Sequence, residues 1–221
     1  MIDWRAIDTV LLDMDGTLLD LHFDSHFWLE HLPRRYGELH RLDEATQDEL
    51  RARIIREQGS LNWYSLAYWS RELGVDIVAL KREVQHLIGL RGDALDFLQW
   101  LKRAHPRVVL ATNADRESLA LKLPLTGLEA YLDAIVSSAD LGVPKEAQAF
   151  WFALQEIEPF DPERTLFIDD NPVVLESARE YGIRHLLGIK QPDSTRPERK
   201  LEKFVALDRF AALLPAERPT T

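Results

Sequence analysis

The chain has 221 residues, of which 46% are hydrophobic and 29% charged, and it contains no cysteine. This length and composition indicate one globular domain, or one domain with a smaller insertion. Disulfides, thiolate metal sites and a cysteine nucleophile are excluded. Lysine and arginine total 27 against 37 aspartates and glutamates, a net charge of −10. Such a charge disfavours nucleic acid and anionic membranes as partners.

The sequence also bears on location and partners. No apolar stretch reaches the roughly 20 residues that a membrane-spanning helix requires, and the first residues lack a secretory signal. We therefore expect a cytoplasmic protein that binds a small molecule, with no nucleic acid and no membrane as partner. The sequence leaves the oligomeric state unknown and is compatible with a monomer. An anionic substrate would need a local positive site.

Short apolar runs, each followed by turn residues, are typical of buried strands in a parallel sheet. They occupy residues 9–12, 107–111, 134–137, 165–168 and 185–188. Helix-length stretches lie between the later runs, at residues 116–123, 146–157 and 172–181. Because strands and helices alternate, the sequence predicts an α/β fold with a doubly wound parallel sheet.

The segment between the first two predicted strands is different, since its apolar residues recur at helical spacing. Four helices are predicted there, over residues 24–36, 44–58, 63–73 and 77–88. Asp43, Asn62 and Asp76 are the candidate N-terminal capping residues. About 70 residues is too long for an ordinary crossover. We therefore predict an inserted all-helical cap at 21–90 and a core made of 1–20 and 91–221, in which 190–203 form a surface loop before a short helix and a frayed tail.

Polar motifs follow four of the predicted elements, at the edge where open α/β sheets bind ligands. Pro144 is expected to begin a helix, which puts Lys145 in its first turn. If the first strand is central, the motifs converge on one crevice. They are Asp13-Met14-Asp15-Gly16-Thr17, Thr112-Asn113, Val143-Pro144-Lys145-Glu146 and Asp169-Asp170-Asn171-Pro172.

The carboxylates of these motifs cannot share a crevice without a neutralising charge. A hard divalent cation with oxygen ligands is the simplest remedy, and Mg²⁺ is the ion expected beside a phosphate. Lys145 would offset part of the remaining negative charge. The sequence therefore predicts a magnesium site that also receives an anionic substrate.

The segments DMDGTLLD, TN, PK and FIDDN resemble, in order, the four motifs of the haloacid dehalogenase superfamily of phosphotransferases. The resemblance covers residues 1–20 and 91–215, and the insert is similar to the family's cap. It implies that Asp13 is a nucleophile that becomes an aspartyl phosphate. It also implies that Asp15 is the general acid for the leaving alcohol and then the base for water.

The same resemblance implies the remaining site residues. Thr112 and Asn113 hold phosphate oxygens, and Lys145 bridges the phosphate and the nucleophile. Gly16 permits the tight turn after the first motif. The Mg²⁺ ligands implied are Asp13, the backbone carbonyl of Asp15, and Asp170, with Asp169 binding directly or through water. Asp170 is favoured over Asp169 for direct contact, because Asn171 and Pro172 follow it.

The predicted cap is rich in aromatic residues, and its segment LNWYSLAYWSRELGVDI is similar to bacterial purine nucleotidases of this superfamily. That similarity implies hydrolysis of GMP and IMP. Most of the rings are expected to be cap core, with one or two stacking on a base, and Asn62 could bond a base edge. The rings are Phe23, Phe27, Trp28, Tyr36, Trp63, Tyr64, Tyr68 and Trp69; those able to reach the leaving group are Trp28, Trp63, His22 and His26.

Some other functions of the same fold require different residues. A dehalogenase does not need Asp15, and a phosphonate hydrolase needs a cap lysine, for which Lys81 is the sole candidate and has no distinguishing feature. A sugar-phosphate phosphatase or a phosphoglucomutase-type phosphotransferase shares all four motifs and stays open as an alternative. A non-catalytic phosphate-binding module is the remote one.

Overall fold

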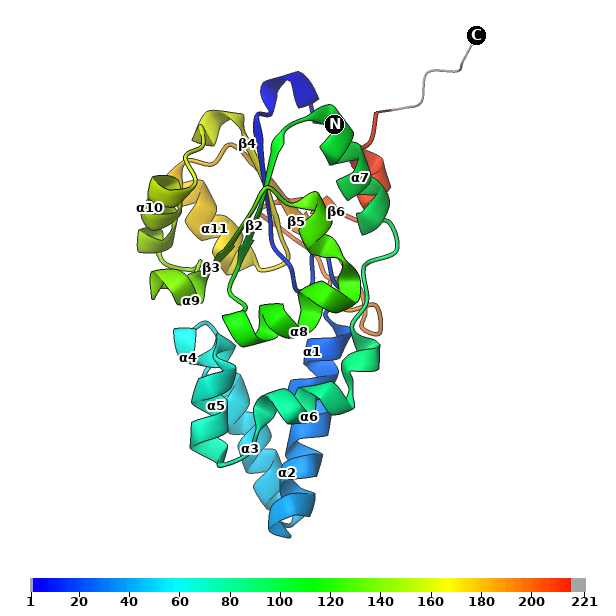
Figure 1. The fold of residues 1–221 in the computed structure, drawn as a ribbon, viewed down its shortest axis with the longest axis vertical. Helices are drawn as coiled ribbons and strands as arrows, with labels where there is room; N and C mark the ends of the chain where they lie inside the picture. The colour runs from blue at the N-terminus through cyan, green and yellow to red at the C-terminus, as the bar shows by residue number, and fades with distance from the viewer. Residues whose placement is uncertain (1, 216–221) are drawn as a thin grey trace.

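A computed structural model describes residues 2–215 of the chain, and its centre is a parallel sheet of six strands (Figure 1). The strand order is β3-β2-β1-β4-β5-β6, which confirms the central position expected for the first strand. The strands are β1 (Thr9–Leu12), β2 (Arg107–Thr112), β3 (Ala134–Ser137), β4 (Thr165–Asp169), β5 (His185–Ile189) and β6 (Val205–Leu207).

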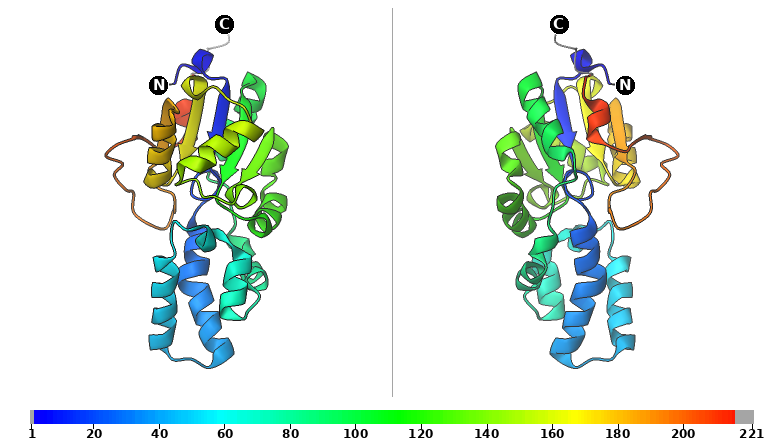
Figure 2. Two further views of the ribbon diagram at one scale, coloured as in Figure 1. Left: turned by 90° about the vertical axis from the view of Figure 1, so that its left-hand side faces the viewer. Right: turned by 90° about the vertical axis from the view of Figure 1, so that its right-hand side faces the viewer.

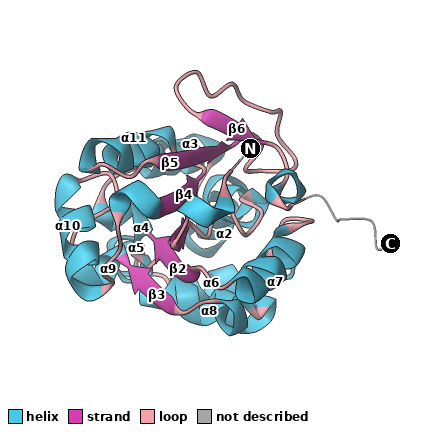
Figure 3. Cartoon of the chain, turned by 90° about the horizontal axis from the view of Figure 1, so that it is seen from above, coloured by secondary structure: helices cyan, strands magenta, loops and turns pink. Residues whose placement is uncertain are grey.

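Helices cover both faces of the sheet, so the predicted doubly wound α/β fold is confirmed (Figure 3). Strand side chains alternate between the two faces: Val10 and Leu12 belong to one buried core, and Leu11 to the other. On the first face lie α7 (Ala94–Ala104), α8 (Arg116–Thr126) and η6 (Phe210–Leu213); on the second lie α10 (Gln148–Ile157) and α11 (Pro172–Tyr181), and α9 (Ser138–Leu141) follows β3.

A bundle of helices between residues 22 and 87, here called the helical region, lies at the carboxyl ends of the strands (Figure 2). It has its own buried core, which includes Phe27, Trp69 and Ile77. The division into a core of 1–20 and 91–221 and a cap of 21–90 stays a prediction. The helices are α1 (His22–His26), the π-helical turn η2 (Phe27–His31), α2 (Leu32–His40), α3 (Glu44–Arg56), α4 (Leu61–Tyr64), α5 (Leu66–Leu73), α6 (Ile77–Glu83) and η3 (Gln85–Leu87).

Capping residues explain where these helices begin. The carboxylates of Asp43 and Asp76 accept the backbone N–H groups of Thr46 and Ala79, as predicted. The prediction for Asn62 is wrong, because Asn62 lies inside α4. The hydroxyls of Ser60 and Ser65 cap α4 and α5 instead, and the second cap splits the single helix expected over 63–73.

Several elements differ from the sequence-based prediction. Helix α7 and strand β6 were not predicted; β6 has three residues and pairs with β5 at the end of the strand order. The loop expected over 190–203 is present, but Pro192 and Asp193 are buried in it. The predicted tail beyond residue 215 lies outside the described residues. Within residues 2–215, no helix has the length and apolar character needed to cross a membrane.

Candidate active site

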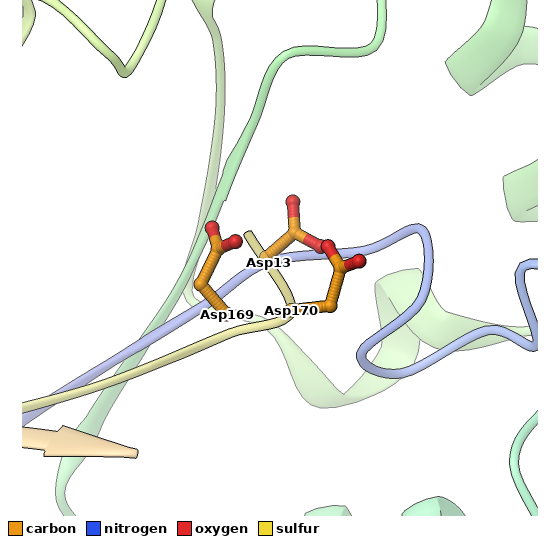
Figure 4. Close-up of side chains that lie close together, drawn as sticks. All are labelled: Asp13, Asp169 and Asp170. Atoms are coloured by element: carbon orange, nitrogen blue, oxygen red, sulfur yellow. The ribbon is translucent and has the colours of Figure 1, made fainter. Parts of the chain in front are cut away.

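Three carboxylates converge at the carboxyl edge of the sheet (Figure 4). Asp13 directly follows β1, Asp169 is the last residue of β4, and Asp170 follows it. One oxygen from each carboxylate lies within 4.8 Å of the others. Because β1 and β4 are hydrogen-bonded neighbours in register, the shared edge brings together residues that are far apart in the sequence.

Lys145 lies between two of these carboxylates. Its Nζ lies 2.6 Å from Oδ1 of Asp13 and 2.7 Å from Oδ2 of Asp169, and it also donates to the Ala111 carbonyl at 3.0 Å. Burial disfavours the charged lysine, but Asp13 and Asp169 raise its pKa above the ordinary value, so it stays an ammonium. The prediction that Lys145 lies in the first turn of a helix is wrong, because α10 begins at Gln148.

The carboxylate cluster can hold a metal ion. Burial raises the pKa of Asp13 to about 6, although Lys145 opposes the rise. Burial, together with Asp169 and Asp13, raises the pKa of Asp170 well above its ordinary value. Oδ2 of Asp13 is buried without a hydrogen-bond partner among residues 2–215. A cation at the cluster would supply that partner and offset the repulsion.

Gly16 allows the loop after β1 to pass close to this cluster. Its φ is +87°, and a Cβ at this position would lie 2.8 Å from Cγ of Asp170. Any other residue would therefore clash with the cluster and adopt a strained backbone.

Asp15 is not a member of the three-carboxylate cluster. Its Oδ1 accepts a hydrogen bond from Nζ of Lys122 at 2.7 Å. Burial raises the pKa of Asp15 to about 6, with Lys122 lowering it and Asp24 raising it. For both Asp13 and Asp15, burial is the main cause of the raised pKa.

Thr112 and Asn113 are buried at the end of β2. The Thr112 hydroxyl accepts the Ala114 N–H at 3.0 Å. The Asn113 amide donates to Glu146 at 2.9 Å, and its Oδ1 accepts the Lys145 N–H at 2.9 Å. The Asn113 contacts hold the turn that carries Lys145. The predicted contacts of Thr112 and Asn113 with phosphate stay a prediction.

A cavity of about 330 Å³ lies between the sheet edge and the helical region. Every predicted site residue except Gly16 lines it, as do Trp28 and Trp63, whereas His22 and His26 do not. The sheet side contributes Asp13, Asp15, Thr112, Asn113, Lys145, Asp169 and Asp170, and the helical region contributes Trp28, Gln58, Trp63, Tyr64 and Lys81.

Three charged residues that line the cavity were missed by the sequence analysis: Asp24, Lys122 and Arg199. Lys81 was considered there only as a candidate cap lysine. The view that Lys81 has no distinguishing feature is wrong, since it is 1% exposed and lines the cavity. Helical spacing could have predicted that Lys122 is buried, because it follows the buried Leu119 by three residues and therefore lies on the same face of the helix. Arg199 comes from a loop, and its guanidinium lies 3.6 Å from Oδ2 of Asp170.

The motif order and the geometry agree with a family assignment. The sequence model of the haloacid dehalogenase-like hydrolase family matches residues 7–182 of the chain. The chain belongs to this hydrolase family. Its predicted membership is therefore confirmed.

Relatives of this hydrolase include the GMP/IMP nucleotidase YrfG of Escherichia coli (strain K12). The two are 42% identical over 216 residues, which is 97% of each chain. The crystal structure of a HAD phosphatase from Thermococcus onnurineus is similar with a TM-score of 0.75 at 19% identity, over 94% of this chain and 96% of that one. The crystal structure of a putative beta-phosphoglucomutase from Thermotoga maritima is similar with a TM-score of 0.65 at 19% identity, over 92% of this chain and 95% of that one. These two structures share the fold.

Proposed function

We propose that this hydrolase is a Mg²⁺-dependent phosphomonoesterase that works through an aspartyl phosphate, and that it is a purine 5′-nucleotidase acting on GMP and IMP. The observation that carries the proposal is the position of Asp13. Asp13 lines the cavity, with Oδ1 held by Lys145 and Oδ2 buried without a protein partner among the described residues. A cytoplasmic location stays part of the proposal.

Mg²⁺ would be held by Asp13, Asp170 and the backbone carbonyl of Asp15, with Asp169 binding directly or through water. When bound, it neutralises carboxylate and phosphate oxygens, which otherwise repel each other. The direct ligand is Asp170 in preference to Asp169, because Oδ2 of Asp169 already accepts a hydrogen bond from Lys145 at 2.7 Å.

In the first chemical step, a carboxylate oxygen of Asp13 attacks phosphorus in line with the ester bond. The bond from Asp13 to phosphorus forms, the bond from phosphorus to the 5′ oxygen breaks, and Asp15 donates a proton to that oxygen. Lys145 fixes the Asp13 carboxyl during the attack. Thr112 and Asn113 bind the phosphate oxygens, whereas Gly16 does not line the cavity and its N–H donates to the Leu19 carbonyl at 2.9 Å.

In the second step, Asp15 removes a proton from water, and the water oxygen attacks phosphorus. The bond between phosphorus and Asp13 breaks, which releases inorganic phosphate and restores the Asp13 carboxylate. Asp15 then carries the proton that the next leaving alcohol receives, so one carboxyl serves both steps.

The substrate proposal rests on the helical region. Trp28, Trp63 and Tyr64 line the cavity opposite the carboxylates, and aromatic faces suit stacking with a purine. The match to a GMP/IMP nucleotidase over 97% of both chains supports the same substrate class. Asn62 is exposed and does not line the cavity, so Gln58 is the better candidate for bonding a base edge.

The test is a screen of phosphate esters with the purified protein, with and without Mg²⁺. We expect Mg²⁺-dependent phosphate release from GMP and IMP, with kcat/KM at least about tenfold above that for glucose phosphates. Preference for a sugar phosphate would contradict the proposed substrate and leave the proposed mechanism unchanged. Isomerisation without phosphate release would indicate a mutase, and binding without any turnover would indicate a phosphate-binding module.

Without a bound metal, repulsion among the carboxylates should make the free energy of unfolding depend on pH. The pKa of Asp13 is raised from 3.8 to about 6, so the folded state binds more protons than the unfolded state in this range. The free energy of unfolding in EDTA should therefore fall as pH rises from about 4 to 7, by about 1–3 kcal/mol. Urea unfolding at several pH values measures it. Saturating Mg²⁺ should reduce the fall, and a rise in EDTA would contradict the prediction.

A further inference from the structure

Four side chains of alternating charge connect the candidate active site to the helical region. Oδ1 of Asp15 lies 2.7 Å from Nζ of Lys122, which lies 2.6 Å from Oδ2 of Asp24. Oδ1 of Asp24 in turn lies 2.7 Å from Nζ of Lys81. Lys122 is on α8 beside the sheet, whereas Asp24 and Lys81 are on α1 and α6. These four residues are called the buried ion-pair chain below.

A gain in stability where the helical region meets the sheet does not by itself explain the buried ion-pair chain. Lys81 and Lys122 are each 1% exposed, and burying charged groups costs several kcal/mol per ion before pairing offsets it. Aromatic faces offset part of the cost: Nζ of Lys81 lies 4.9 Å from the Phe23 ring centroid, and Nζ of Lys122 lies 5.3 Å from it. Apolar side chains of similar volume would join the two parts at least as well.

The buried ion-pair chain ends at the carboxyl of Asp15, which the proposed reaction uses. Lys122 holds Oδ1 of Asp15, and no residue between 2 and 215 donates a hydrogen bond to Oδ2. The Asp15 side chain is 22% exposed and lines the cavity. One oxygen is thus fixed by an ammonium, and the other is available to the substrate. The ammonium is itself held by Asp24, so its position depends on α1.

We propose that Lys122 is a positioning residue for Asp15, and that Asp24 makes this positioning depend on how the helical region sits against the sheet. The inference rests on the proposed phosphatase reaction, in which Asp15 protonates the leaving oxygen. An alkoxide leaves poorly without that proton, whereas p-nitrophenolate leaves as a stable anion. A misplaced Asp15 therefore slows cleavage of an alkyl ester far more than that of p-nitrophenyl phosphate.

The primary variant is Lys122→Met, which keeps the length of the side chain and removes its charge. We expect kcat/KM for GMP to fall about 100-fold and kcat/KM for p-nitrophenyl phosphate to fall only a few-fold. The parameter kcat/KM reports only the steps up to formation of the aspartyl phosphate, and in that last step Asp15 acts as an acid. Equal falls for both esters would overturn the positioning role.

Two controls separate positioning from packing. Lys102→Met removes a lysine that does not line the cavity and whose Nζ donates to the Ala130 carbonyl; it should leave kcat/KM for both esters unchanged. In an Asp15→Asn background, Lys122→Met should cause no further loss with GMP, because no acid is left to position. A full further loss there would make Lys122 a packing residue.

Folding and substrate choice are controlled separately. If Lys122→Met does not fold, Lys122→Met combined with Asp24→Asn removes one positive and one negative charge, and the same difference between esters is expected. If the wild type prefers another alkyl phosphate to GMP, that ester replaces GMP; the substrate proposal then fails while the test of Lys122 stands. A wild type that cleaves no phosphate ester overturns both.

Discussion

Replacing Asp13 with asparagine is expected to lower kcat for phosphate-ester hydrolysis by about 10⁵-fold or more, while the chain stays folded. The amide has the same shape as the carboxylate, but it lacks the charge needed to attack phosphorus. The change also removes one of the three crowded carboxylates at the site. Loss of activity through unfolding is therefore not expected.

Phosphate release, circular dichroism and acid-quenched labelling with radioactive phosphate ester measure this prediction together. The wild type should retain label on Asp13 and the variant should retain none. Asp8→Asn is the matched control, because Asp8 precedes the same strand at its opposite end and is an exposed partner of Arg164. The control should keep full activity. Turnover by Asp13→Asn near the wild-type rate would remove Asp13 from the proposed role.

The strand-end residues were predictable from the sequence for a simple geometric reason. Asp13, Thr112 and Asp169 each lie at or just after the end of an apolar run, and parallel strands place their carboxyl ends at one edge. Once β1 is central, β2 and β4 are its neighbours. The position of these residues along the chain therefore implied that they lie close together in space.

Residues that reach the site from helices and loops were not predictable in this way. Lys122 is 107 residues from Asp15 and 98 residues from Asp24 in the sequence. No local pattern determines how α8 and α1 face each other, so helical spacing could indicate only that Lys122 is buried. The contact of Arg199 with Asp170 depends on the path of an irregular loop, which residue type alone does not fix.

The turn at Pro144 shows how a local rule gave the wrong position for a correctly chosen residue. Proline is common at the first position of a helix, and this favoured a helix starting at Pro144. A lysine in the first turn would oppose the helix dipole. The structure avoids that conflict with a turn closed by the Ala147 N–H and the Pro144 carbonyl at 3.0 Å. Helix α10 then begins at Gln148.

Lys145→Met should affect stability and activity together. The variant leaves Asp13 and Asp169 buried without their shared ammonium, and removing one partner of a buried ion pair costs about 3–5 kcal/mol. Activity should fall about 10³-fold, because the Asp13 carboxyl loses the group that orients it and offsets charge at the phosphate. Urea unfolding in EDTA measures the first effect, and phosphate release at saturating Mg²⁺ measures the second.

Adding Asp169→Asn separates the two effects. The double variant Lys145→Met/Asp169→Asn removes one charge of each sign, so it should recover much of the lost stability. It should not recover activity, because Asp13 remains without its ammonium partner. Lys102→Met is the control for loss of a lysine, since Lys102 donates to the Ala130 carbonyl at the surface and lies 5.7 Å from the Tyr131 ring centroid, away from the cavity. It should change stability by no more than about 1 kcal/mol. Joint recovery of stability and activity would mean that Lys145 serves the fold and not the reaction.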